Sequence, residues 1–112
     1  MLCITFRHIS GSRATEVDVV PMGAHRELIL GRAPSAAVRF DPRGDPMVGR
    51  QHARITPCVD DPRRLMLSDL GSRNGTLLNG EPVAAIVAIK SGDVVRLGAS
   101  GPELEVVIEF GQ

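Results

Sequence analysis

The chain has 112 residues, of which 43% are hydrophobic, and we expect residues 1–112 to form a single domain with its own core. Thirteen basic and thirteen acidic residues give a formal net charge of zero, and the absence of Trp and Tyr also argues against nucleic-acid binding by charge or by base stacking. No apolar run approaches the roughly 20 residues that span a bilayer, so we expect no membrane insertion.

Alternation of apolar and polar residues predicts several strands in the first part of the chain. The expected strands are residues 2–7, residues 15–20 with Pro21 ending them, residues 27–30 and residues 37–40. Residues 41–48 are rich in Asp, Pro and Gly, a composition typical of a loop.

The rest of the chain continues with short strands between turn signals. The further expected strands are residues 52–56, 64–68, 76–78, 94–97 and 103–110. Residues 83–89 follow Pro82 and fit either irregular structure or a strand. In the last strand four apolar residues are expected to face one way, namely Leu104, Val106, Ile108 and Phe110. No segment shows a convincing helical period, so the pattern predicts an all-β sandwich or barrel of about ten short strands.

Residues 69–76, which read Asp-Leu-Gly-Ser-Arg-Asn-Gly-Thr, contain several polar groups between two apolar runs. Asn74 and Gly75 both tolerate positive φ, which favours a tight hairpin-type turn at this place. The Asn74 amide is both a donor and an acceptor, so it can pair with the backbone of an extended peptide. Arg73 carries a fork of donors that suits phosphate, and Ser72 adds a hydroxyl. The alternative is that this loop only turns the chain.

The cysteines and histidines show no metal-ligand spacing, and we expect neither a metal nor a cofactor. Residues 1–6 are apolar but too short for a secretory signal, so the cytoplasm is the expected location. Cys3 and Cys58 are therefore expected to be free thiols, and a disulfide between them is the alternative. No nucleophile–base pair or phosphate-cradling loop before a helix is present, so we expect no enzymatic activity. The predominance of Arg over Lys suggests a bacterial source.

Five short motifs follow one another along the chain. They are Gly31-Arg32, Gly-Arg-Gln-His-Ala at 49–53, the stretch 69–76, Asn79-Gly80, and Ser-Gly-Asp-Val at 91–94 with Leu97-Gly98. In this order, on a β-only background, they resemble the forkhead-associated (FHA) domain along nearly the full chain. The resemblance implies a two-sheet β-sandwich of about eleven short strands, with loops at one end that bind phosphothreonine peptides. It also implies an interaction module rather than an enzyme.

The resemblance implies roles for particular residues. Arg32 would contact the phosphate, Asn74 would hold the peptide backbone, and Arg73 would line the phosphothreonine pocket. Ser72, in the same loop, joins this predicted phosphopeptide-binding set together with Gly49 and Arg50. Four residues would support the loops: Gly31, His52, Gly75 and Thr76. Gly31 would let the backbone turn, and His52 would brace the binding loops by hydrogen bonds without touching ligand. Gly75 and Thr76 would shape the turn.

Gly49 departs from the family pattern, which usually has Ser three residues before the histidine. That Ser would donate its hydroxyl and its backbone N–H to the phosphate, whereas Gly49 is expected to donate the N–H alone. A hydrogen bond to a charged group contributes about 1.5–3 kcal/mol, so its loss predicts roughly ten- to a hundred-fold weaker binding. Arg50 and Arg73 offer compensation, because with Arg32 they would place three guanidinium groups around one dianion. Arg50 fits equally well as a solvent-exposed residue at the start of a strand.

The function expected first is phosphothreonine-dependent recognition of a protein phosphorylated by a Ser/Thr kinase. The expected partner is therefore a phosphothreonine-containing protein or peptide. The alternative, motivated by Gly49, is an FHA scaffold that docks its partner without phosphate, as in a bacterial secretion or regulatory assembly. Peptide specificity and oligomeric state do not follow from the sequence.

Overall fold

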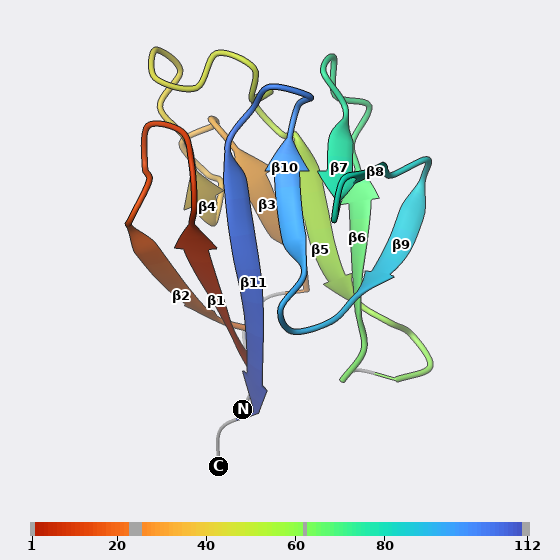
Figure 1. Ribbon diagram of the computed structural model, residues 1–112. Coiled ribbons are helices and arrows are strands. Elements are labelled where there is room, and N and C mark those ends of the chain that lie inside the picture. The colour runs from red at the N-terminus through yellow and green to blue at the C-terminus, as the bar shows by residue number, and fades with distance from the viewer. Residues whose placement is uncertain (1, 23–25, 62, 111–112) are drawn as a thin grey trace.

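The computed structural model describes residues 2–22, 26–61 and 63–110. These residues form eleven strands and no helix, and the strands make two sheets that pack face to face (Figure 1). This arrangement confirms the predicted all-β sandwich of about eleven short strands. No segment in the described ranges is a helix with the length and hydrophobicity to cross a membrane.

Each sheet combines strands from distant parts of the chain. In spatial order, the six-stranded sheet consists of β2 (Val17–Pro21), β1 (Leu2–His8), β11 (Glu103–Phe110), β10 (Val94–Leu97), β7 (Thr76–Leu78) and β8 (Glu81–Pro82). The five-stranded sheet consists of β4 (Val38–Arg39), β3 (Leu28–Gly31), β5 (Ala53–Pro57), β6 (Leu65–Asp69) and β9 (Ile86–Ile89). All pairs are antiparallel except β3 with β4.

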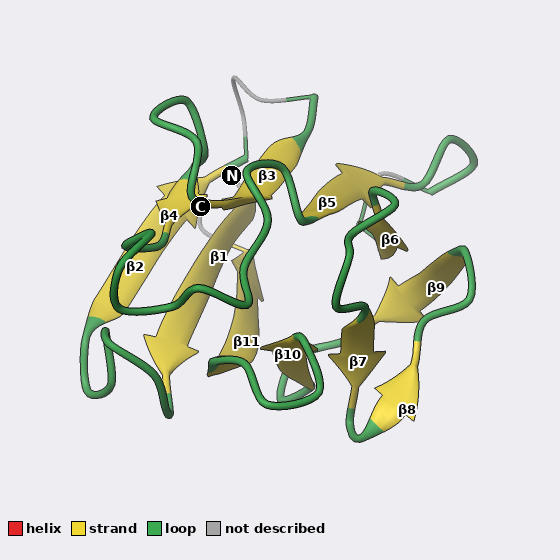
Figure 2. Ribbon diagram, turned by 90° about the horizontal axis from the view of Figure 1, so that it is seen from above, coloured by secondary structure: helices red, strands yellow, loops and turns green. Residues whose placement is uncertain are grey.

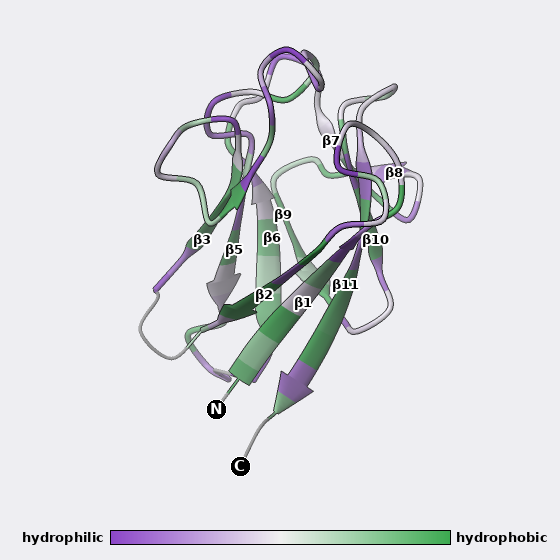
Figure 3. Cartoon of the chain, turned by 90° about the vertical axis from the view of Figure 1, so that its left-hand side faces the viewer, coloured by the Kyte–Doolittle hydropathy of each residue, from purple (hydrophilic) through white to green (hydrophobic). Residues whose placement is uncertain are grey.

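The hydrophobic core lies between the sheets and consists of the inward-facing residues that alternate along each strand. Its largest fully buried apolar side chains are Phe6, Phe40, Ile4, Leu28, Leu30, Ile55, Leu65, Leu67, Leu97 and Leu104. Burying one side chain of this size contributes about 1.5–3 kcal/mol, so the core rather than the loops holds the sandwich together. Figure 3 shows hydrophobic residues concentrated in the strands and hydrophilic ones in many of the loops.

Most predicted strands lie within one or two residues of the observed ones, and the differences have local causes. β2 begins at Val17 instead of residue 15, because Thr15 has a φ of 77°, which an extended strand does not contain. Pro21 ends β2 as predicted, and it is tolerated there because β2 is an edge strand. The ambiguous stretch 83–89 forms β9 from Ile86 onward, and the two-residue strand β8 was not predicted.

Burial decreases along the last strand. Leu104 and Val106 are fully buried and Ile108 is partly buried, whereas Phe110 is 50% exposed. Phe110 lies at the end of β11, beyond most of the core, and the Arg63 guanidinium lies 4.7 Å from its ring centroid. The shared face predicted for these four residues is therefore a core face only over its first part.

The hairpin predicted at Asn74-Gly75 is wrong. β6 before it belongs to the five-stranded sheet and β7 after it to the six-stranded sheet, so residues 70–75 cross between sheets. The hairpin occurs instead at Asn79-Gly80, which joins the paired strands β7 and β8. Asn79 and Gly80 have φ values of 51° and 85°, the two positive values that a type I′ turn requires.

Four loops gather at one end of the sandwich, here called the loop end (Figures 1 and 2). They are residues 9–16 between β1 and β2, residues 40–52 between β4 and β5, residues 70–75 and residues 98–102. β1 begins and β11 ends at the opposite end (Figure 1). Cys3 and Cys58 are free thiols, as predicted.

Candidate functional site

Arg32 follows β3 directly and is held against the β4–β5 loop. Its backbone N–H donates to the Gly49 carbonyl at 3.0 Å, and its side-chain Nε donates to the Val48 carbonyl at 2.8 Å. Arg32 is partly buried, and in the described part of the chain its terminal guanidinium nitrogens form neither a hydrogen bond nor an ion pair. The guanidinium is therefore anchored on one side and has donors left on the other.

Gly31 permits the close approach that this anchoring requires. A Cβ at Gly31 would overlap the Arg50 carbonyl oxygen and would lie 2.9 Å from the Gly49 carbonyl oxygen. Its φ lies outside the left-handed region, so close packing rather than turn geometry demands glycine here. A side chain would push the β4–β5 loop away and break the hydrogen bond from Ala33 N–H to the Arg50 carbonyl.

His52 links the β4–β5 loop to the β6–β7 loop. Its ring is fully buried, with Nδ1 accepting from Gly49 N–H at 2.9 Å and Nε2 lying 2.7 Å from the Gly75 carbonyl. This pairing assigns the ring proton to Nε2, which donates to Gly75. Burial lowers the pKa of His52, against the opposing effects of the Gly75 carbonyl and Asp69, which favours the neutral ring that this pattern needs. The His52 side chain is therefore buried, and both of its ring nitrogens are engaged within the protein.

The structure corrects one expectation about Gly49. Its N–H, predicted to be available to phosphate, already donates to His52 Nδ1. Residue 49 therefore offers a phosphate neither a hydroxyl nor this N–H. Gly49 has no left-handed φ, and the nearest contact of a Cβ there would be 3.7 Å, to the His52 ring. A serine at this position would fit without backbone strain.

Arg50 and Arg73 lie on two different loops at the loop end, and both are exposed. Neither forms an ion pair with a carboxylate in the residues that the structure describes. With Arg32 they make three guanidinium groups whose positive charge is not neutralised by an acidic side chain in the described part of the chain. In the same ranges, no residue accepts a hydrogen bond from the Arg50 backbone N–H.

Asn74 joins the β6–β7 loop to the β4–β5 loop. Its side-chain Nδ2 donates to the Met47 carbonyl at 2.9 Å, and no described donor engages its Oδ1. Gly98 packs beneath this contact, because a Cβ there would lie 3.3 Å from the Cβ atoms of both Asn74 and Met47. Gly98 belongs to one of the sequence motifs, whereas no sequence signal identified Met47.

Asp69, to which the sequence assigned no role, organises the β6–β7 loop. Its carboxylate accepts from the N–H groups of Gly71 and Ser72, each at 3.1 Å, and from the hydroxyls of Ser72 and Thr76. Burial raises the pKa of Asp69, but the hydrogen bonds from Ser72 and Thr76 outweigh it, so the net pKa is lowered. The Ser72 hydroxyl also accepts from Gly75 N–H at 2.9 Å, and this geometry favours a structural role for Ser72 over ligand contact.

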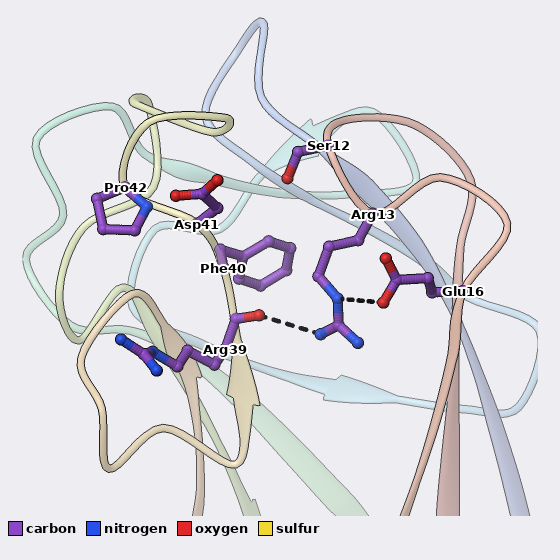
Figure 4. Close-up of a pocket in the computed structure, with 7 residues that line it drawn as sticks. All are labelled: Ser12, Arg13, Glu16, Arg39, Phe40, Asp41 and Pro42. Carbon is purple, nitrogen blue, oxygen red and sulfur yellow. Dashed lines mark hydrogen bonds and ion pairs between the residues drawn. The ribbon is translucent and has the colours of Figure 1, made fainter.

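A separate surface pocket lies between the β1–β2 loop and the segment after β4 (Figure 4). Its lining residues are Ser12, Arg13, Glu16, Arg39, Phe40, Asp41 and Pro42. Arg13 is already engaged by Glu16, by Asp18 and by the Arg39 carbonyl. None of the residues predicted to bind phosphopeptide lines this pocket. In the described ranges no three potential metal-binding side chains gather either.

Comparison with known proteins identifies the family. The FHA domain family model matches residues 28–98. An FHA domain whose interactions depend on phosphothreonine is 30% identical, with a TM-score of 0.74, over 97% of this chain and 99% of that chain. The FHA domain of FhaA, solved with the intracellular domain of Rv3910, is 30% identical, with a TM-score of 0.71, over 92% of this chain and 98% of its own.

A more distant neighbour supports the fold alone. The kinase-interacting FHA domain of the Arabidopsis kinase-associated protein phosphatase is 23% identical, with a TM-score of 0.80, over 99% of this chain and 97% of its own. No curated protein matches the chain. The family match nevertheless covers more than half of the residues, and the two nearer domains align over almost the full length. The chain belongs to the FHA domain family.

Proposed function

We propose that this chain is a phosphothreonine-dependent interaction module that reads proteins phosphorylated by Ser/Thr kinases. The observation that carries the proposal is the anchoring of Arg32 on the Val48 carbonyl through Nε, which leaves its terminal donors without a partner among the described residues. Arg pairs with phosphate through parallel N–H···O bonds, and a phosphothreonine carries about −1.5 to −2 charges. One FHA domain at 30% identity has interactions that depend on phosphothreonine, which supports the proposal.

The proposed roles follow from the free groups at the loop end. Arg32 binds the phosphate directly, and Arg50 and Arg73 add positive charge from their own loops. The Arg50 backbone N–H has no acceptor among the described residues. It donates to the phosphate in place of the Gly49 N–H, for which that role was expected. Asn74 accepts a peptide N–H at its Oδ1, because its Nδ2 is occupied by Met47.

Gly49 makes the proposed affinity modest. Neither a hydroxyl nor a free N–H comes from this residue, and each hydrogen bond to a charged group contributes about 1.5–3 kcal/mol. The exposed guanidinium groups of Arg50 and Arg73 offset part of this loss, although solvent and salt screen charges at such exposed positions.

We further propose that residues 1–112 act as one FHA domain in the cytoplasm and without enzymatic activity. Strands β1, β2 and β11 lie outside the family match but share a sheet with β7 and β10, which supports a single unit. FHA domains are interaction modules rather than enzymes. Two free cysteines fit a reducing compartment.

The test is a calorimetric titration with a degenerate phosphothreonine peptide pool, with the unphosphorylated pool as control. Saturable binding to the phosphorylated pool alone is the expected result. Binding of neither pool would contradict the proposal and turn the search to phosphate-independent docking, in which a pull-down would be insensitive to phosphatase. Neither the structure nor the comparisons favour that alternative.

A further inference from the structure

We infer that Ser12 and Asp45 form a latch that positions Arg32 and Asn74 from outside the binding site. Through this latch the β1–β2 loop, which carries none of the proposed ligand-contacting residues, sets the affinity for phosphopeptide. The inference rests on the proposed function above. It is carried by hydrogen bonds that connect Ser12 to the turn at residues 45–48, and by hydrogen bonds from this turn to the two side chains.

The latch consists of the buried Asp45 carboxylate, which accepts hydrogen bonds from Ser12 of the neighbouring β1–β2 loop. Asp45 is only 4% exposed, and its Oδ1 accepts from Ser12 N–H at 3.0 Å while its Oδ2 accepts from the Ser12 hydroxyl. The two loops touch closely, since a Cβ at Gly44 would lie 2.5 Å from the Ser12 Cβ. A buried carboxylate without these donors would be costly, so the loops are held together at this point.

Asp45 also shapes the segment that follows it. Its backbone N–H donates to the Asp41 carbonyl at 2.8 Å, and its carbonyl accepts from Val48 N–H at 3.1 Å. Residues 45–48 are thereby fixed in a turn. The direction in which the Met47 and Val48 carbonyls point is consequently tied to the position of Asp45.

Those two carbonyls are the anchors of the proposed ligand-binding side chains. The Met47 carbonyl accepts from Asn74 Nδ2 at 2.9 Å, and the Val48 carbonyl accepts from Arg32 Nε at 2.8 Å. A single short segment therefore orients both the phosphate contact and the peptide contact. If the latch opens, both side chains lose their anchors together, which makes Asp45 a positioning residue.

Asp93 provides a matched control at the other end of the sandwich, in the turn between β9 and β10 (Figure 1). It is 5% exposed and likewise holds a loop by its carboxylate, which accepts from Lys90 N–H at 2.9 Å and from Asn79 Nδ2 at 3.1 Å. Replacing either carboxylate removes a similar set of hydrogen bonds. Only Asp45, however, is connected to Arg32 and Asn74.

The experiment compares Asp45→Ala and Asp93→Ala with the unaltered chain, at a temperature where circular dichroism shows all three folded. We expect Asp45→Ala to weaken binding of a phosphothreonine peptide about 3- to 30-fold, the range typical of coupling through a packed network. Asp93→Ala should change the affinity less than about 2-fold. Unchanged affinity in Asp45→Ala, or equal weakening in both variants, would overturn the inference.

A second measurement needs no ligand. The Asn74 side-chain amide should give an NMR signal shifted and protected by its bond to the Met47 carbonyl, and Asp45→Ala should abolish this protection while Asp93→Ala preserves it. If the unaltered chain binds no phosphopeptide, the proposed function fails, and this signal alone then decides the latch. An Asn74 signal that is the same in Asp45→Ala and the unaltered chain would refute it.

Discussion

Two loops that meet at the loop end use their polar groups in opposite ways. In the β6–β7 loop, Asp69, Ser72 and Thr76 bond to one another and to nearby backbone N–H groups, so these polar atoms are satisfied internally. The β4–β5 loop instead supplies backbone carbonyls that accept from Arg32 and Asn74, whose terminal guanidinium nitrogens and Oδ1, respectively, have no partner among the described residues. The difference teaches that a polar loop residue is a ligand candidate only if its own loop does not already satisfy it.

The largest expected effect is that of Arg32→Ala, which removes the main free donor at the loop end. Loss of two charge-assisted hydrogen bonds, each contributing about 1.5–3 kcal/mol, should weaken phosphopeptide binding at least about 100-fold. The free energy of unfolding should fall by only about 1 kcal/mol, from the lost bond to Val48. Calorimetric titration measures the affinity and urea unfolding measures the stability. Arg32→Lys is the control, because it keeps the positive charge but not the forked set of guanidinium donors.

Equal phosphopeptide affinity in Arg32→Ala and the unaltered chain would contradict this contrast between the two loops, because the unpaired donors of Arg32 would then contribute nothing to binding.

Asp69→Ala should show the opposite pattern, with its main effect on stability. The substitution leaves the donors of Gly71, Ser72 and Thr76 without their acceptor, and we expect the free energy of unfolding to fall by about 2–4 kcal/mol. Urea unfolding measures this loss. Phosphopeptide affinity should fall less than in Arg32→Ala, because Asp69 contacts no ligand in the proposed complex.

The pH dependence of unfolding adds a control for Asp69. The folded protein lowers the pKa of this carboxyl, so its stabilising effect is complete above the ordinary value of 3.8 and disappears as the pH falls through the lower folded pKa. Asp69→Ala should therefore lose less stability than the unaltered chain over this acid range. Parallel acid curves for the two proteins would contradict the role assigned to Asp69.

Gly49→Ser tests the contrast between the two loops by adding a hydroxyl donor to the β4–β5 loop. The Cβ fits, and the new hydroxyl would supply one hydrogen bond to the phosphate, so binding should become about 10-fold tighter. Stability should change little, because the N–H still donates to His52. Titration with the same phosphopeptide tests this, and Gly49→Ala is the control that adds a side chain without a donor. If Ser and Ala variants bind equally, the hydroxyl does not reach the phosphate.

Ser72→Ala has the smallest expected effect. It removes one hydroxyl from the internal network of the β6–β7 loop, which should lower the free energy of unfolding by about 1 kcal/mol. Phosphopeptide affinity should stay within about 2-fold of the unaltered chain. A loss of affinity above 10-fold with unchanged urea unfolding would instead return Ser72 to the ligand-binding set predicted from the sequence.

The local alternation of apolar and polar residues was sufficient to predict most of the fold. Alternating residues predicted nearly every strand, because one face of each strand is buried and the side-chain period is two. The Asn-Gly pairs show where such reasoning stops. Residues 74–75 and 79–80 look alike in sequence, yet only the second pair closes a hairpin, since the sheet that each flanking strand joins depends on packing across the whole core.

The sequence by itself determined the family and the types of residue at the loop end, including the absence of a hydroxyl at Gly49. Only the tertiary structure decided which polar atoms remain free. The Gly49 N–H is taken by His52, the Ser72 hydroxyl by Asp69, and one end of Asn74 by Met47. These bonds lie within or between two loops, β4–β5 and β6–β7, so each of them depends on how those loops are folded and placed. Hydrogen-bond satisfaction depends on atomic distance and direction, which a linear order of residues does not contain.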